Sequence, residues 1–164
     1  MSAKRRSYEA GHKPKYLVVI DDTPECDRAV YWASRRAART EANLIMLHVI
    51  APADRNQQWL GVADIMRAEA REEANTMLRR FAGRVNGIAG ITPEHAIREG
   101  DLVEEILALI DEDQDIATLV LAAGTAKEGP GPIVSGLAKI IGNFAVPVAL
   151  VPGHLSDEEL DSLS

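Results

Sequence analysis

The stretch YLVVIDDTPECDRAV, residues 16–30, decides how the fold is interpreted. Its first five residues form a continuous apolar run, which is typical of a strand that is covered on both faces of a sheet. Two aspartates end this run, and Thr23 and Pro24 then supply a helix N-cap and a first-turn proline. From Cys26 onward, apolar residues recur at helical spacing. The stretch therefore predicts a buried strand, a short acidic turn and a helix.

The same alternation recurs along the rest of the chain. Further strands are predicted by apolar or alternating runs at residues 44–50, 94–99, 118–121 and 146–151. Further helices are predicted at residues 62–81, at 101–110 with a capping box of Asp101 and Glu104, and at 134–142. Strands that alternate with helices imply a single-domain α/β fold with a parallel, doubly wound sheet and helices on both faces. Ligands of such sheets bind at the carboxyl ends of the strands, where Asp21 and the glycine-rich loop lie.

The composition fits one soluble globular domain. The chain has 164 residues, of which 46% are hydrophobic and 26% charged. Its net charge of −7 makes nucleic acid an unfavourable partner, and no apolar run approaches the roughly 18 residues of a membrane span. A single cysteine and the lack of a secretory segment are typical of a cytoplasmic protein.

The two ends of the chain differ in charge from its centre. Residues 1–14 are basic and are predicted to form a disordered arm, and residues 153–164 are acidic and are predicted to form a solvated tail. The folded domain is therefore expected to span residues 15–152.

Several segments resemble the universal stress protein family. They are YLVVIDDTPECDRAVYWASRRAARTEANLIMLHVI, IREGDLVEEILALI, LVLAAGT and SGLAKIIGNFAVPVALVP, and their order and spacing are similar to those of the family over about residues 15–152. The resemblance implies a five-stranded sheet in the order 3-2-1-4-5 and a homodimer, which we expect to pair through the last strand. It also implies that ATP or ADP, with Mg²⁺, is held between the first and fourth strands.

The resemblance further implies a set of nucleotide contacts. Asp21 would face the adenosine half, Val49 would lie against the adenine, and Gly124 would open the phosphate loop. Lys127 stands where the family has its second glycine, and we expect its ammonium group to contact a phosphate. The complete set of expected binding residues is Ile20, Asp21, Val49, Ala123, Gly124, Thr125, Lys127, Gly129, Gly131, Ser135 and Gly136.

The loop AAGTAKEGPGPIVSG, residues 122–136, departs from the family's pattern of Gly, two residues, Gly, nine residues, Gly, then Ser or Thr. Its second half is shortened, and Pro130 and Pro132 have no N–H to donate to a phosphate. Two functions therefore stay open. One is an ATP-binding regulatory protein of the stress response, and the other is a dimeric protein-interaction module without nucleotide. In both cases the protein partner is unknown.

Other chemistries find less support in the sequence. A response-regulator receiver domain would need an acceptor Asp after the third strand and a Lys after the fifth, and neither is present. The four histidines lack metal-ligand spacing, and Ser135 lacks a Gly-x-Ser-x-Gly elbow. We therefore predict no catalytic residue and no resident metal site, with slow ATP hydrolysis as the most that the chain would perform.

Overall fold

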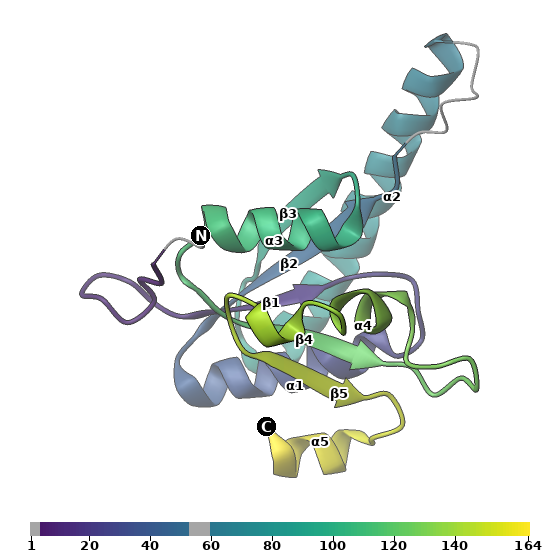
Figure 1. Ribbon diagram of the computed structural model, residues 1–164. Coiled ribbons are helices and arrows are strands. Elements are labelled where there is room, and N and C mark those ends of the chain that lie inside the picture. Colours follow the sequence, from purple (N-terminus) through teal and green to yellow (C-terminus); the bar gives the residue numbers. More distant parts are fainter. Residues whose placement is uncertain (1–3, 53–59) are drawn as a thin grey trace.

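The computed structural model describes residues 4–52 and 60–164. Within them, five parallel strands form one sheet in the order β3-β2-β1-β4-β5 (Figure 1), which confirms the predicted architecture. The strands are β1 (Lys15–Val19), β2 (Asn43–Ile50), β3 (Glu94–Glu99), β4 (Ile116–Ala123) and β5 (Val148–Pro152).

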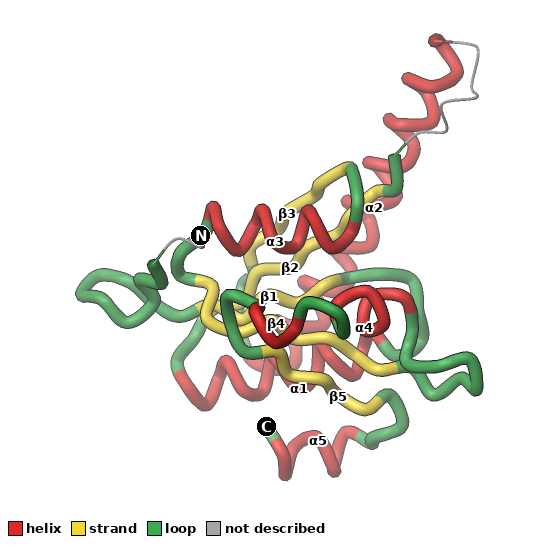
Figure 2. The backbone as a smooth tube through the Cα atoms, in the orientation of Figure 1, coloured by secondary structure: helices red, strands yellow, loops and turns green. Residues whose placement is uncertain are grey.

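Helices cover both faces of this sheet (Figure 2). The helices are α1 (Cys26–Thr40), α2 (Leu60–Ala89), α3 (Leu102–Glu112), α4 (Pro132–Leu137) and α5 (Asp157–Leu163), with a short 3₁₀ turn at Ile141–Asn143. One face of the sheet carries α1 and α2, and α5 packs on α1. The opposite face carries α3 and α4.

The continuous apolar run of β1 is explained by this two-sided cover. Val18 and Ile20 point into the core beneath α1 and α2, whereas Leu17 and Val19 point into the core beneath α3 and α4. All four side chains are buried, because successive residues of a strand face opposite sides of the sheet. The central strand is thus covered on both faces, as predicted.

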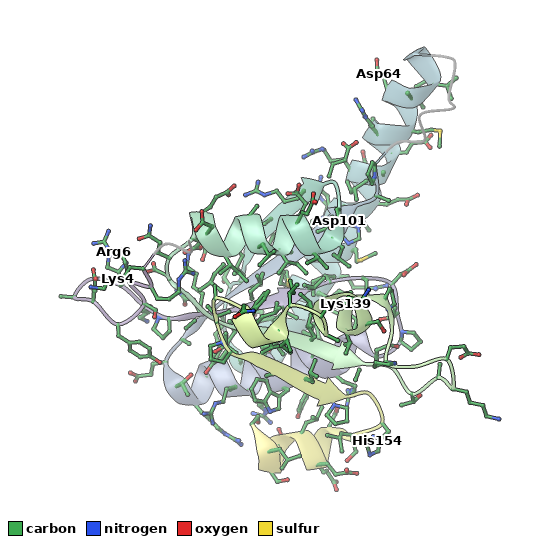
Figure 3. All side chains as sticks on the ribbon, viewed as in Figure 1. Lys4, Arg6, Asp64, Asp101, Lys139 and His154 are labelled. Carbon is green, nitrogen blue, oxygen red and sulfur yellow. The ribbon has the colours of Figure 1, made fainter. Side chains whose placement is uncertain are left out.

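Helix α2 is longer than the predicted 62–81. Its buried side chains continue through Phe81 to Val85, and the helix ends before Gly90, whose φ of +68° suits a glycine. The first turns of α2 extend beyond the sheet (Figure 1), and Asp64 lies on this projecting part (Figure 3). Met66, which was predicted to lie on the buried stripe, is for this reason 46% exposed.

The predicted fourth helix is divided. Helix α4 ends at Leu137, and only a 3₁₀ turn, Ile141–Asn143, follows before β5.

Helix α3 is capped by Asp101 as predicted, because the Asp101 side chain accepts a hydrogen bond from the N–H of Glu104.

The acidic C-terminal segment forms a docked helix and not the predicted tail, although most of its acidic side chains remain exposed. Ser156 caps α5, and Leu160 is completely buried against the core beneath α1. Arginines of α1 hold the helix from outside, since Arg28 is paired with Asp157 at 2.8 Å and Arg35 with Asp161 at 2.7 Å. His154 lies in the turn between β5 and α5 (Figure 3). The segment is therefore part of the folded domain.

The basic N-terminal segment also makes specific contacts from residue 5 onward, which differs from the predicted disordered arm. The N–H of Arg6 donates to the carbonyl of Gln114 at 2.8 Å, and Ser7 is buried. The Nδ1 of His12 lies 2.7 Å from a carboxylate oxygen of Asp115. These contacts bind the segment to the connection between α3 and β4.

Among the described residues, none of the helices combines the length and apolar character that crossing a membrane requires.

Candidate functional site

The candidate site lies where the neighbouring strands β1 and β4 end at the same edge of the sheet. Strand β1 leads into α1 on one face, and β4 leads into α4 on the other (Figure 1). This reversal of direction opens a crevice at the carboxyl ends of doubly wound sheets. Here Asp21 and Glu25 line the crevice from the β1–α1 turn, and Pro130 and Gly131 line it from the β4–α4 loop.

Asp21 is held in a fixed position by its own turn. Its Oδ1 accepts hydrogen bonds from the N–H of Thr23, at 3.0 Å, and from the Thr23 hydroxyl. Thr23 is therefore engaged and does not cap α1, where Glu25 occupies the N-cap position without a side-chain cap. The prediction of Thr23 as the cap is wrong for this reason. Within the described parts of the chain, no hydrogen bond reaches Oδ2 of Asp21, so this oxygen can accept one from a ligand.

Ile20 and Val49 differ in what they offer to the site. The Ile20 side chain is 1% exposed in the core beneath α1, and its carbonyl accepts a hydrogen bond from Nδ1 of His48 at 2.7 Å. His48 is thus a satisfied histidine beside the core, as predicted. Val49 is half-buried on the opposite side of the sheet, where it packs against the same core as Ile133.

Cys26 lines the crevice but is not a nucleophile. Its side chain is 3% exposed, and burial raises the pKa of the thiol to about 12. A thiol with such a pKa stays protonated and unreactive at neutral pH. The prediction that Cys26 belongs to the core is confirmed.

The backbone of the β4–α4 loop is partly engaged within the chain. Three N–H groups donate to carbonyls of the same segment: Gly124 to Pro130 at 2.9 Å, Gly129 to Ala126 at 3.1 Å, and Ser135 to Gly131 at 3.1 Å. Gly129 and Gly131 have φ values of +120° and +106°, which favour glycine. The loop is therefore closed by two internal bonds, from Gly124 and Gly129, whereas the Ser135 bond belongs to the first turn of α4. These three amides would reach a phosphate only after leaving their present partners.

The remaining expected contact residues are spread around this loop. The side chains of Thr125, Lys127 and Ser135 are exposed. Ala123 accepts a hydrogen bond from the N–H of Gly153 at 2.9 Å. At Gly136 an added Cβ would lie 3.3 Å from the side chain of Val103, so this glycine permits close packing of α4 on α3. The structure thus brings Asp21 and Gly131 together in the crevice, whereas Lys127 lies outside it.

Glu25 is the charged residue of the crevice that the sequence pattern did not predict. A Cβ built on Gly124 would lie 2.9 Å from Oε1 of Glu25, so the carboxylate lies against the start of the loop. The crevice has a volume of about 20 Å³, which holds about one water molecule. A larger ligand therefore requires the loop or the Glu25 side chain to move. The position of Glu25 directly after Pro24, at the start of a helix beside the predicted site, was the available signal.

The site offers few ligands to a metal ion. Asp21 and Glu25 bring two carboxylates to the crevice. Within residues 4–52 and 60–164, no group of three or more His, Cys, Asp or Glu side chains is arranged to hold a metal ion. Mg²⁺ commonly binds through one or two carboxylates together with substrate phosphates, so in this site it would arrive with a nucleotide.

The fold is a doubly wound α/β domain with a crevice at the switch point between β1 and β4. A model of the universal stress protein family matches residues 14–152. The chain belongs to the universal stress protein family, and the family resemblance found in the sequence is confirmed. No curated protein matches the chain.

Solved structures of other universal stress proteins share this fold at low sequence identity. UspA from Lactobacillus plantarum is 19% identical with a TM-score of 0.71, over 84% of this chain and 97% of its own. A protein from Arabidopsis thaliana with AMP bound is 20% identical with a TM-score of 0.60, over 88% and 94% of the two chains. A protein from Archaeoglobus fulgidus in complex with dAMP is 17% identical with a TM-score of 0.58, over 84% and 96%.

Proposed function

We propose that this universal stress protein is a cytoplasmic regulatory protein of the stress response that binds an adenine nucleotide in the crevice between β1 and β4. ATP or ADP, with Mg²⁺, are the nucleotides that the family resemblance implies. The proposal includes no catalytic step. Two observations support it: the crevice lies at the switch point of the sheet, and similar structures from other organisms contain AMP and dAMP.

The main support for the proposal is the fixed position of the Asp21 carboxylate. One of its oxygens is fixed by Thr23, and the side chain lines the crevice. A carboxylate is an acceptor only, so it would recognise a donor such as a ribose hydroxyl or the amino group of adenine. Val49 would lie beside the base, and Ile20 would hold Asp21 in place through the backbone.

The phosphates would lie along the β4–α4 loop once this loop has opened. Gly124 and Ala123 would form its start, and Gly129, Gly131 and Gly136 would allow the backbone to approach. Thr125, Lys127 and Ser135 would supply two hydroxyls and an ammonium group. All three side chains are exposed, so they can turn toward a ligand without leaving a core.

A protein-interaction module without nucleotide is the second candidate. The small crevice volume of about 20 Å³ favours it, as does the bond from the N–H of Gly124 to the carbonyl of Pro130. In this alternative the loop would remain closed and would serve as part of the surface for an unknown protein partner.

We also propose a homodimer through β5. This strand lies at one edge of the sheet, where Leu150 is 45% exposed, and Ile141 close by in the chain is 44% exposed. An exposed apolar edge strand favours pairing with a second chain. Sedimentation of the dilute protein should give a dimer mass, and a monomer mass would contradict this part of the proposal.

The Asp21→Ala variant tests the nucleotide site. A hydrogen bond to a charged group contributes about 1.5–3 kcal/mol, so this variant should bind adenosine roughly 10- to 100-fold more weakly in calorimetry. Asp22→Ala is the matched control, since Asp22 is an exposed acid of the same turn outside the crevice. Equal binding by Asp21→Ala and the parent, with both variants folded, would show that the site is misplaced.

A further inference from the structure

The carboxylate of Glu25 stands at the end of the crevice where a phosphate chain would have to pass. Its Oε1 lies 2.9 Å and its Cδ 3.4 Å from the position of a Cβ on Gly124. On the other side, a Cβ built on Gly153 would lie 3.0 Å from Cβ of Glu25. The side chain is therefore enclosed between the ends of β4 and β5, directly at the residue that opens the expected phosphate loop.

In the described parts of the chain, Glu25 has no basic side chain as a partner, although it occupies the N-cap position of α1. Among the described residues no ion pair or side-chain hydrogen bond involves Glu25, whereas Asp27, two residues later, is paired with Arg84 at 3.0 Å and Arg28 at 2.6 Å. The two charged side chains that line the crevice, Asp21 and Glu25, are both acidic. The crevice therefore presents negative charge to any ligand that enters it.

The cation of the β4–α4 loop lies outside the crevice. Lys127 is exposed on the β4–α4 loop and is not part of the crevice lining. A group in solvent is screened by water and salt, whereas charges that face each other inside a narrow crevice are screened less. Each added phosphate should consequently be opposed by Glu25 more strongly than it is attracted by Lys127.

We propose that Glu25 determines the charge of the ligand, so that the crevice prefers adenosine or adenosine monophosphate to ADP and ATP. This inference rests on the proposed adenine-nucleotide function. Because Glu25 lies beside the loop and not beside Val49 on β2, it acts on the phosphate end of the ligand and leaves the adenosine end unaffected. Two like charges about 5 Å apart in a partly solvated crevice weaken binding on the order of tenfold.

The test is a calorimetric comparison of adenosine, AMP and ATP, each with Mg²⁺ and with a chelator. The parent should bind ATP at least about tenfold more weakly than adenosine, with AMP in between. Glu25→Gln should strengthen ATP binding about tenfold and change adenosine binding little. The matched control is Glu128→Gln, because Glu128 is an exposed acid of the same loop that does not line the crevice.

The outcomes separate this inference from the proposed function. If the parent binds ATP as tightly as adenosine, or if Glu25→Gln leaves their ratio unchanged, Glu25 does not select the ligand, although the nucleotide function stands. If Glu25→Gln weakens ATP binding only in the presence of Mg²⁺, Glu25 holds a metal ion and the inference is wrong. If no variant binds adenosine or any nucleotide, the proposed function fails and the inference fails with it. A thermal melt confirms that each variant is folded.

Discussion

Gly153 marks the point where the end of β5 touches the end of β4. Its N–H donates to the carbonyl oxygen of Ala123 at 2.9 Å. A Cβ built on Gly153 would lie 2.6 Å from this oxygen and 3.0 Å from Cβ of Glu25, and both distances are shorter than the roughly 3.5–4.0 Å of favourable contact. The oxygen belongs to the strand backbone and cannot turn away as a flexible side chain would. A Gly153→Ala substitution must therefore separate β5 from β4 locally.

We expect Gly153→Ala to lower the free energy of unfolding by about 1–3 kcal/mol, the usual cost of overpacking. In a domain of this size, each kcal/mol lowers the melting temperature by about 2–4 °C. Urea denaturation followed by circular dichroism measures the change, and the slope against urea concentration should stay constant.

Two further glycines serve as controls. Gly124→Ala should cost less than Gly153→Ala, since the nearest atom to its Cβ, at 2.9 Å, is the end of the flexible Glu25 side chain. Gly87→Ala should stabilise the protein by roughly 0.5–1 kcal/mol, because Gly87 lies inside α2 and nothing is within 4 Å of its Cβ. If Gly153→Ala is as stable as the parent while Gly87→Ala is more stable, the described contact between residues 123 and 153 is wrong.

Three further predictions concern other parts of the molecule. Leu160→Ala should cost about 2–5 kcal/mol in urea denaturation, because Leu160 is completely buried; an unchanged midpoint would mean that α5 is not docked. For Asp27, burial raises the pKa, but hydrogen bonds from Arg84 and Arg28 outweigh it and hold the pKa below its ordinary value. The pairing therefore stabilises the fold above about pH 4, and this stabilisation is lost as the pH falls further. In thermal melts, Asp27→Asn should be less stable than the parent at pH 7, and the difference should shrink at pH 3. A difference that stays the same at both pH values would contradict this prediction. Because Lys127 is exposed, Lys127→Ala should weaken ATP binding less than about fivefold in calorimetry and leave adenosine binding nearly unchanged; tighter ATP binding would show that the lysine obstructs the site.

The strands could be predicted from the sequence because each is signalled within its own residues. The apolar run from Tyr16 to Ile20 already shows that both faces of β1 are covered, and the structure divides these residues between two cores. The turn after the run, with Asp21, follows directly from the strand end, which is why its place at the sheet edge could be predicted.

The docking of α5 could not be predicted from its composition. The start of the helix is indicated by a capping box, since Ser156 accepts a hydrogen bond from the N–H of Glu159 at 3.1 Å. The partners that turn an acidic segment into a docked helix, Tyr31 and Arg35 among them, lie far earlier in the chain. Charge alone favours solvation, and only the arrangement of α1 shows where the acidic side chains are neutralised.

The contacts inside the candidate site could not be predicted from the sequence either. The pattern of glycines predicted a loop that approaches a ligand, but the bond from Gly124 to Pro130 and the position of Glu25 depend on how α1, β4 and β5 meet. A glycine can serve a ligand or a close packing of the chain itself. Gly136 allows close packing against Val103, and this use does not depend on a ligand.

The central claim is that an adenine nucleotide binds in the crevice between β1 and β4. Its most direct test is a titration of AMP into the isotope-labelled protein, followed through the backbone amide signals in NMR spectra. We expect saturable shifts that are concentrated at residues 20–25, at Val49 and in the loop 124–131, with residues of α5 unaffected. Spectra that stay unchanged up to millimolar AMP, or shifts confined to other parts of the chain, would contradict it.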